Sequence, residues 1–368
     1  MSANLDVCVV GGGPAGLAAA IALRMRGFSV MLMDCAVPPI DKTCGEGLLP
    51  DSIAGLQELG VAIPSGVGFR FRGVQFTEGD CSVAADFPNG RGIGLRRTVL
   101  HNLLVERAQE VGVSLLWGAN RIRLEEGGIV VDEKRIEPQL VLAADGQNSR
   151  IRRHAGLDQR KPELQRFGFR RHYRVRPWSA YMELYWGKRC QIYITPLSES
   201  EICVALLSRD PKLRLDEALR HFPGIMNRLE SAEPSSVQTG ALTVSRKLRA
   251  VCRPGFAGPA LALIGDASGS VDAITGEGLG LSFRQAVALA RAFRAGKLSS
   301  YAKAHQVLSR RPRFMGALLL RLGEHERLRR RVLETLARHP DIFARLLAIH
   351  VGEYRSSGAR RIPSPISQ

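Results

Sequence analysis

Short apolar runs alternate with a helical pattern over the first 35 residues. Residues 7–10 are all apolar and lead directly into a glycine-rich turn, and residues 15–25 have the Ala- and Leu-rich spacing of a buried helix that ends at Gly27. Residues 28–33 form a second apolar run, which Asp34 closes. The pattern predicts a strand, a helix and a second strand, the unit from which parallel sheets are built.

The rest of the chain carries two kinds of pattern. Residues 69–88 alternate between apolar and polar positions, and so do residues 166–208, where aromatic residues are also frequent. This alternation predicts a separate antiparallel sheet. Elsewhere we expect buried strands at residues 113–117, 129–131, 140–144 and 261–264, helices at residues 98–110 and 278–295, and basic helices from residue 299 onward.

The turn after the first strand has the spacing G-x-G-x-x-G at Gly11, Gly13 and Gly16. Gly11 permits a tight turn, Gly13 lets the backbone approach a pyrophosphate, and Gly16 lets the helix pack closely on its strand. Pro14 suits the first helical turn, whose free N–H groups and dipole attract phosphate. Asp34 lies where an acidic residue binds the ribose hydroxyls of an adenosine. The unit therefore predicts a dinucleotide site.

Two further turns follow predicted buried strands. Asp145 lies in the segment 143–150, and Asp266 lies in the segment 265–269. In a doubly wound sheet both turns lie at the carboxyl ends of strands, where ligands bind. A surface Asp-Gly turn is the ordinary alternative for each, but the three turns in this order predict one cofactor site.

These three segments resemble the FAD fingerprints of the glutathione-reductase-like flavoproteins, in the branch that holds p-hydroxybenzoate hydroxylase and geranylgeranyl reductase. The resemblance covers most of residues 1–165 and 250–305. Residues 41–50, Asp-Lys-Thr-Cys-Gly-Glu-Gly-Leu-Leu-Pro, look like the Cys-Gly-x-Gly flavin loop of geranylgeranyl-reductase-like proteins. Residues 275–280, Thr-Gly-Glu-Gly-Leu-Gly, look like the Thr-Gly-Glu-Gly turn of the same proteins.

The resemblance implies bound FAD and assigns residues to it. At the adenosine and phosphate end they are Pro14 and Ala15 at the pyrophosphate, Asp34 at the adenosine ribose, Arg97 (with Arg96 as the alternative) at the phosphate or ribose, and Arg121 near the adenine through its backbone. Asp145 and Asp266 lie at the cofactor-facing turns, the latter on the ribityl or phosphate. At the ring they are Cys44, Gly45 and Gly47 along the isoalloxazine, and Gly278 and Leu279 at the pyrimidine edge.

The start of a helix at Gly278 has an independent reason. Reduced flavin carries negative charge near N1 and O2, and the positive end of a helix dipole stabilises such a charge. Glu277 would oppose this charge, so we expect it to turn outward or to pair with an arginine such as Arg284.

The expected fold is α/β. A Rossmann-like FAD-binding domain is formed by residues 1–68, 89–165 and 255–298, and an inserted, mostly antiparallel β-sheet substrate domain by residues 69–88 and 166–254. Residues 299–355 are expected to form C-terminal helices, and residues 356–368, which are polar with prolines, a disordered tail.

Four residues are candidates for chemistry. For Cys44 we favour a structural contact with the flavin over a chemical role, because a free cysteine is usually a small buried apolar residue. For Glu46 we favour a solvated loop carboxylate over an acid or base. His172 and Tyr193 lie in the predicted substrate sheet and are candidate proton donors, with a packed or surface position as the ordinary alternative. The scattered cysteines indicate no metal site.

The net charge of +17 in 368 residues bears on the partners. The charge is densest after Arg310 and does not alternate with aromatic residues, so we expect no nucleic acid. Residues 310–350 are basic and rich in leucine, which fits peripheral contact with an anionic membrane or, the interpretation we favour, a lid whose leucines face the protein. The sequence predicts a cytoplasmic protein for three reasons. Its seven cysteines are scattered, it has no apolar run of membrane-spanning length, and we expect no signal peptide.

Three functions remain open. A single-component FAD monooxygenase would insert oxygen into a hydrophobic aromatic or polyketide-like substrate with NAD(P)H and O2. A flavin ene-reductase would reduce a C=C bond of a prenyl or lipid substrate. The third alternative is a non-catalytic redox module that binds flavin. The flavin loop favours the ene-reductase. However, residues 191–196 keep only Tyr193 and Pro196 of the Tyr-x-Trp-x-Phe-Pro motif of geranylgeranyl reductases, which places the monooxygenase slightly ahead.

Two further motifs are missing from the sequence. The Trp-x-Trp-x-Ile-Pro signature of flavin halogenases is absent, which disfavours halogenation. No second G-x-G-x-x-G follows a strand, so NAD(P)H would bind transiently, or a partner reductase would supply the electrons.

Overall fold

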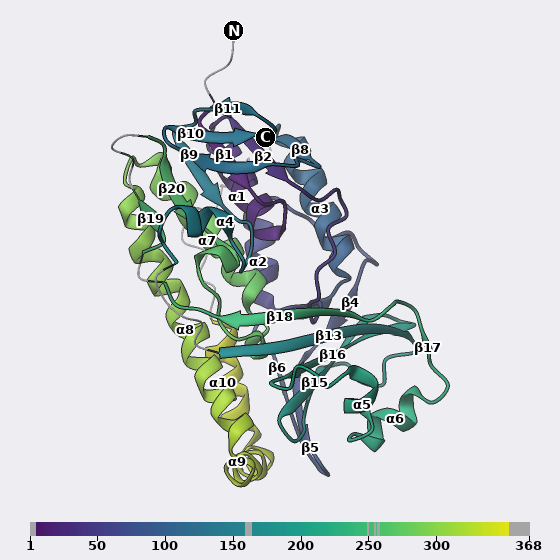
Figure 1. Ribbon diagram of the computed structural model, residues 1–368. Coiled ribbons are helices and arrows are strands. Elements are labelled where there is room, and N and C mark those ends of the chain that lie inside the picture. The colour runs from purple at the N-terminus through teal and green to yellow at the C-terminus, as the bar shows by residue number, and fades with distance from the viewer. Residues whose placement is uncertain (1–4, 159–163, 249, 254, 256–257, 353–368) are drawn as a thin grey trace, which may run out of the picture.

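The computed structural model describes residues 5–158, 164–248, 250–253, 255 and 258–352. The expected tail, residues 356–368, lies outside this part of the chain. Within the described residues the chain forms a largely parallel sheet, a large mostly antiparallel sheet, two three-stranded sheets and ten α-helices. Figure 1 shows the parallel sheet at one end of the molecule, the large sheet at the other, and the helix α8 (Leu298–Glu324) running alongside both.

The parallel sheet has the order β19-β20-β12-β1-β2-β8. Neighbouring strands from β20 to β8 are parallel, and β19 adds an antiparallel edge. The predicted buried strands are confirmed, with ends that differ by one or two residues. The strands of this sheet are β1 (Val7–Val10), β2 (Val30–Asp34), β8 (Ser114–Trp117), β12 (Leu140–Ala143), β20 (Ala260–Leu263) and the edge strand β19 (Cys252–Arg253), which was not predicted.

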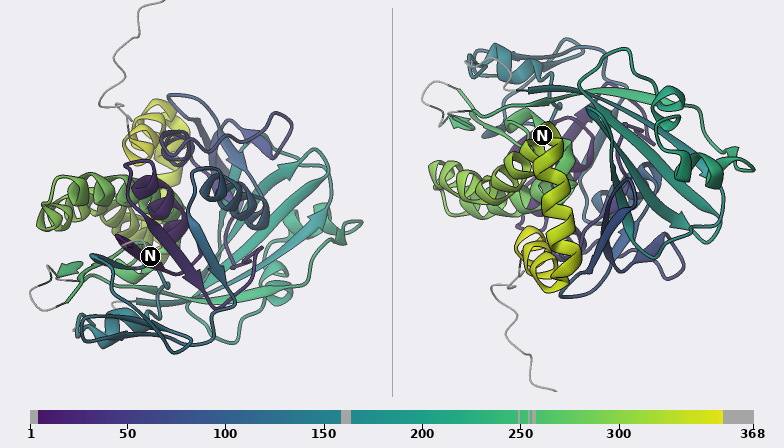
Figure 2. Two further views of the ribbon diagram at one scale, coloured as in Figure 1. Left: turned by 90° about the horizontal axis from the view of Figure 1, so that it is seen from above. Right: turned by 90° about the horizontal axis from the view of Figure 1, so that it is seen from below.

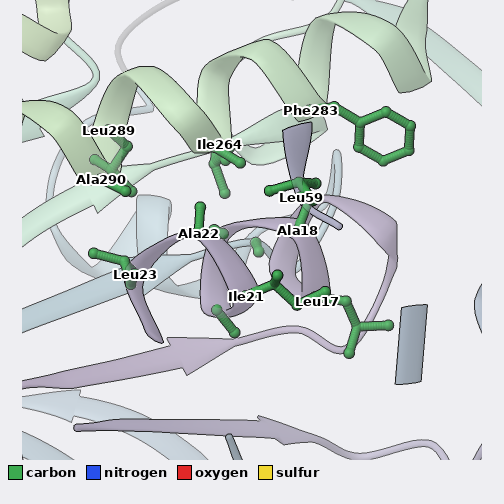
Figure 3. Packing of buried hydrophobic residues seen from close by; sticks show 14 of the residues in the cluster. Leu17, Ala18, Ile21, Ala22, Leu23, Leu59, Ile264, Phe283, Leu289 and Ala290 are labelled. Atoms are coloured by element: carbon green, nitrogen blue, oxygen red, sulfur yellow. The ribbon is translucent and has the colours of Figure 1, made fainter. Parts of the chain in front are cut away.

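Helices α1 (Pro14–Arg24) and α7 (Gly278–Arg294) pack against each other over this sheet. Figure 3 shows Ala18 and Ala22 of α1 facing α7, with Ile264 between the two helices. The small alanine side chains allow this close approach, so the core of the cofactor domain is dense around α1. Helices α2 (Pro50–Glu58), α3 (Arg97–Glu110) and α4 (Arg150–His154) complete the domain.

The large sheet has the order β17-β13-β16-β15-β14-β5-β6, and β18 pairs with β13. All neighbours are antiparallel except β14 and β5, so the expected inserted sheet forms. Its strands are β5 (Gly73–Glu78), β6 (Cys81–Asp86), β13 (Leu164–Arg174), β14 (Met182–Trp186), β15 (Cys190–Ser198), β16 (Glu201–Ser208), β17 (Glu233–Pro234) and β18 (Thr239–Ser245).

The segment 69–71 differs from the expectation. It forms β4 (Phe69–Phe71), which pairs with β7 (Gly92–Gly94) instead of joining the large sheet. β7 also pairs with β3 (Gly47–Leu48), so this small sheet holds the end of the expected flavin loop. The other three-stranded sheet consists of β9 (Ile122–Glu125), β10 (Gly128–Val131) and β11 (Lys134–Ile136).

Alternate residues of the large sheet face two different groups of helices. One face packs on α5 (Leu215–Leu219) and α6 (Pro223–Leu229), and the other on α8, α9 (Glu326–Arg338) and α10 (Pro340–Val351) (Figure 2). Five leucines of the C-terminal segment are buried against the sheet in this way, namely Leu319, Leu322, Leu333, Leu336 and Leu347. In the described part of the chain no helix has the length and apolar character that a membrane crossing requires.

Helix α8 is tied to the end of the parallel sheet by two buried hydrogen bonds. The Tyr301 hydroxyl donates to the Leu263 carbonyl at 2.9 Å, and His305 Nε2 lies 2.8 Å from Ser268 Oγ. Because Ser268 Oγ donates to the Gly265 carbonyl at 2.7 Å, the His305 N–H donates to Ser268. Burial lowers the pKa of His305 to about 4.

This burial predicts a pH-dependent loss of stability. The unfolded chain binds a proton at His305 below pH ~6.5, whereas the folded chain does so only near pH 4, so stability falls as the pH drops between these values. Between pH 7 and pH 4 the free energy of unfolding should therefore fall by about 3 kcal/mol less in His305→Gln, which keeps an N–H donor for Ser268, than in the wild-type protein. Denaturant unfolding at several pH values in this range measures this difference. An equal fall in both proteins would contradict the lowered pKa of His305.

Candidate cofactor site

The glycine turn between β1 and α1 leaves space on one side only. A Cβ on Gly16 would lie 1.8 Å from the Gly11 carbonyl oxygen, and one on Gly11, whose φ is +112°, would lie 2.3 Å from the Ala144 carbonyl oxygen. A Cβ on Gly13 would meet nothing within 4 Å. Gly11 and Gly16 are therefore required by the packing of the protein itself, whereas Gly13 leaves room for a ligand at the start of α1, which has no side-chain cap.

Asp34 is fixed at the same turn. Its Oδ2 accepts from the Gly12 N–H at 2.6 Å, and its Oδ1 accepts from the Ala36 N–H at 2.8 Å. His101 Nε2 of α3 lies 2.9 Å from the Gly12 carbonyl and joins this helix to the turn. The carboxylate at the carboxyl end of β2 is thus positioned as a ribose ligand requires.

Arg97 has the surroundings of a phosphate ligand. Its side chain is buried, and among the described residues its Nε has no hydrogen-bond partner. Its charge acts on Asp41, His101 and Asp266, so it lies among them. Arg96 is instead held by Glu201, with Nε to Oε2 at 2.9 Å. Of the two arginines, Arg97 is the one placed to meet an anionic group.

Asp266 contacts a residue of the flavin loop. Lys42 Nζ lies 3.0 Å from Asp266 Oδ2, and Lys42, with a further contribution from Arg97, lowers the pKa of Asp266. The ionised carboxylate is an acceptor for hydroxyl groups. The contact brings residue 42 beside residue 266, as a cofactor that spans both segments requires.

The start of α7 has a buried carboxylate. Gly278 begins the helix, and a Cβ there would meet nothing within 4 Å. Glu277 does not turn outward and does not pair with Arg284, which contacts Asp51. It lies 3.1 Å from Arg311, a cation that the C-terminal helix α8 brings to this position. Burial raises the pKa of Glu277, although the charges of His350 and Arg311 oppose this.

Two predicted ligands have other partners. Asp145 Oδ2 accepts from the Arg150 N–H at 2.8 Å and so holds the start of α4, while its buried Oδ1 has no partner among the described residues. The Arg121 N–H donates to Asp132 Oδ1 at 3.0 Å, and its carbonyl accepts from the Asp132 N–H at 3.0 Å. The role of either residue in cofactor binding stays a prediction.

Glu46 is the most constrained residue of the flavin loop. It has a φ of +59°, and only 3% of its surface is exposed. Its Oε1 accepts from the Arg97 N–H at 2.8 Å and from Arg170 Nη1 at 2.7 Å, and its Oε2 lies 2.6 Å from His172 Nε2. The expectation of a solvated loop carboxylate was wrong, because β13 supplies two cationic or polar partners that cover it.

The other candidate residues lie around this carboxylate or beside the Ala273–Thr275 turn. Cys44 is half-buried, and its Sγ accepts from the Glu46 N–H at 3.4 Å. The buried Tyr193 hydroxyl donates to the Ile274 carbonyl at 2.9 Å, so it already has an acceptor. Burial, together with the charge of Glu46, raises the pKa of Cys203. Ligand atoms of Glu46, His172 and Cys203 lie within 4.8 Å of one another, but Arg170 on Glu46 disfavours a metal ion.

Sequence reasoning missed three residues that hold the flavin loop. Arg170 Nη2 contacts Asp41 at 2.7 Å, Lys42 contacts Asp266, and Thr195 Oγ1 donates to the Gly45 carbonyl at 2.7 Å. The strand pattern carried a partial signal, because residues 170 and 172 share one face of β13. Thr195 of the segment 191–196 contacts the flavin loop, although most aromatic residues of the motif are replaced.

These observations fit an elongated anionic ligand. The positions where Gly13, Gly45 and Gly278 lack a side chain are open, and Arg97 offers an unpartnered buried nitrogen. FAD would be held by the start of α1, Asp34, Arg97 and Asp266, with its ring beside Gly45 and the start of α7.

Two glycine substitutions separate folding from cofactor binding. We expect Gly16→Ala to destabilise the protein by about 3 kcal/mol, because the new methyl group overlaps a backbone carbonyl that cannot move freely. Gly13→Ala, at a φ of −70° that alanine adopts readily, should keep the melting temperature but weaken FAD binding roughly tenfold or more.

Thermal unfolding of the apoproteins and a fluorescence titration with FAD measure the two effects. Unweakened FAD binding by Gly13→Ala would contradict the placement of the phosphates.

The fold is shared with flavoenzymes of several kinds. The flavin-dependent brominase Bmp2 superposes with a TM-score of 0.80 over 95% of this chain and 94% of its own, at 17% identity. A geranylgeranyl bacteriochlorophyll reductase-like protein of Thermoplasma acidophilum gives 0.72 over 95% and 92%, at 20% identity. The 2-methyl-3-hydroxypyridine-5-carboxylic acid oxygenase gives 0.69 over 86% and 91%, at 21% identity. At these identities the likeness establishes the fold.

Sequence comparison gives the family. A menaquinone reductase of Mycobacterium tuberculosis is 26% identical over 303 residues, 75% of this chain and 73% of its own. A digeranylgeranylglycerophospholipid reductase of Methanocaldococcus jannaschii is 27% identical over 298 residues, with the same shares. The family described as FAD binding domain matches residues 4–296. The chain therefore belongs to this family and is an FAD-dependent oxidoreductase.

Proposed function

We propose that the protein reduces a C=C bond in the isoprenoid chain of a lipid or quinone. The observation that carries this proposal is an apolar cluster that joins the flavin loop to the large sheet. It contains Leu49 after the flavin loop and Ile274 before α7, together with Phe71, Met182, Leu184, Tyr193, Ala205 and Leu207.

This cluster suits an isoprenoid chain better than a phenol. Tyr193, which carries the hydroxyl in the group, already donates to Ile274, so it offers no spare hydrogen for a polar substituent. The apolar side chains of this cluster favour a substrate that buries CH2 and methyl groups, each worth about 0.8 kcal/mol.

The two reductase relatives described above support the same chemistry. They align over about three quarters of their own length and of this chain. Menaquinone and digeranylgeranylglycerophospholipids both carry isoprenoid chains. On this basis we place reduction ahead of oxygen insertion and so reverse the order that the sequence motifs favoured.

The residues of this chain have separate tasks in such a reaction. Reduced FAD supplies the hydride, and NAD(P)H is the reductant typical of the family. Arg97 and Lys42 bind the anionic part of the cofactor, and Thr195 fixes the Gly45 carbonyl of the flavin loop. The apolar cluster excludes water, and α7 directs its positive end toward the negative charge of the reduced ring.

Anaerobic turnover tests this reaction. Purified protein with FAD and NADPH, or with dithionite as the alternative reductant, is mixed with menaquinone or with a digeranylgeranylglycerophospholipid, and products are read by mass. Any quinol formed from menaquinone is first reoxidised in air, and we then expect a lasting gain of two hydrogens for each reduced C=C bond of the isoprenoid chain. Reduced FAD without protein is the control.

Two results would contradict the proposal. One is no change in mass under anaerobic conditions with either reductant. The other is a gain of one oxygen that appears only in air, which would return the monooxygenase to first place.

We further propose peripheral contact with an anionic membrane through α8. Most leucines of residues 310–350, the segment considered for membrane contact, face the protein. Val307, Phe314 and Leu318 of α8, however, are exposed. They share one face of the helix with the exposed Arg310 and Arg321. Apolar side chains among arginines suit the boundary of an anionic bilayer.

Vesicle sedimentation tests this contact. We expect binding to phosphatidylglycerol vesicles at low salt, loss of binding with high salt, and roughly tenfold weaker binding by Phe314→Ser together with Val307→Ser. Ile349→Ser on α10 is the control for an exposed apolar residue elsewhere. Equal binding by all three proteins would remove α8 from the contact.

A further inference from the structure

A chain of three side chains runs from the protein surface to the flavin loop. Ser236 is half-exposed, and its Oγ lies 2.8 Å from His172 Nδ1. His172 is buried, and its Nε2 lies 2.6 Å from Glu46 Oε2. Glu46 stands between Gly45 and Gly47, two of the residues expected along the isoalloxazine. One imidazole therefore separates solvent from the loop that holds the ring.

The hydrogen bonds of Ser236 allow two charge states of this imidazole. Ser236 Oγ accepts from the backbone N–H of His172 at 3.1 Å and can donate its one proton either to His172 Nδ1 or to the Val237 carbonyl at 3.2 Å. In the first case His172 is neutral and donates through Nε2 to Glu46. In the second, Nδ1 carries a proton as well and the ring is charged. The two states differ by a rotation of one hydroxyl.

Charges surround His172 on every element packed against it. They are Asp41 and Glu46 of the flavin loop, Arg170 of β13, Glu201 of β16, and Arg96 and Arg97 at the start of α3. The titratable thiol of Cys203 on β16 also faces this loop, but its raised pKa keeps it neutral. Arg170 offsets one of its two carboxylate partners, and Arg96 offsets Glu201. The charge balance of the loop thus depends on His172 and on whatever charge the bound ring carries.

We propose that His172 is a redox-linked proton acceptor, which takes up a proton at Nδ1 through Ser236 when the bound flavin is reduced. Two-electron reduction adds negative charge to the ring beside this loop, and a cationic imidazole compensates it in a buried site of low dielectric. The proton comes from solvent and returns there when the ring is reoxidised. This role holds for either chemistry considered above.

The test is the number of protons bound per two electrons by the holoprotein without substrate. Spectroelectrochemical titration of the bound FAD at several pH values gives this number from the slope of the midpoint potential. His172→Gln keeps an N–H donor for Glu46 but does not titrate. We expect the wild-type protein to bind up to one proton more per two electrons than this variant in the pH range where the reduced ring is anionic.

Ser236→Ala is the second variant, and His154→Gln is the matched control. Loss of the hydroxyl leaves the protonated Nδ1 of His172 without its acceptor, so Ser236→Ala should reduce the extra proton uptake. If His172→Gln does not fold, Ser236→Ala tests whether His172 takes up the proton. His154 is exposed on α4, and its replacement should leave the slope unchanged.

A purely structural His172 would give a different result. Its replacement would lower the melting temperature or FAD affinity and leave the proton number at the wild-type value. That outcome at every pH would overturn the proposal. Because no substrate is present, it would leave the proposed reduction of C=C bonds untouched.

Discussion

A buried carboxylate that must be neutralised fixes the cofactor domain against the large sheet. Glu46 cannot remain charged in the interior without partners, and it obtains them from two directions, the first N–H of α3 and two side chains of β13. Removing one partner of such a buried pair typically costs about 3–5 kcal/mol. The left-handed backbone at Glu46 is the cost of aiming the side chain between these elements.

The same arrangement places the groups that surround the cofactor. The Arg97 N–H is bonded to Glu46, so the Arg97 side chain starts from a fixed point and reaches toward Asp266. Thr195 holds the neighbouring Gly45 carbonyl from the large sheet. The phosphate-binding end and the ring-binding end of the site are thus positioned by one connected set of contacts, and not by two independent domains.

Local patterns in the sequence predicted the elements well and their long-range partners poorly. The glycine turn, Asp34, the strands of the parallel sheet and the start of α7 follow from spacing within about 30 residues. Glu46 and His172 are 126 residues apart, and Glu277 and Arg311 are 34 apart across a helix. No periodicity encodes such pairs, so Glu46 was expected in solvent, and Glu277 was expected to turn outward or to pair with an arginine such as Arg284. Charge alone could not reveal them, because arginines are frequent throughout the chain.

The C-terminal helices explain why so basic a chain buries acidic residues near its cofactor. Arg311 of α8 contacts both Asp51 of α2 and Glu277 at the start of α7, while His350 Nε2 of α10 lies 3.0 Å from the Thr275 carbonyl. These contacts join the C-terminal helices to the turn expected at the pyrimidine edge. An acid at the positive end of a helix would otherwise compete with an anionic ring for the dipole. If the flavin lies at the start of α7 as proposed, the pairing of Glu277 with Arg311 would leave the amides of α7 available to it. The role of the helices would then extend beyond covering the apolar face of the sheet.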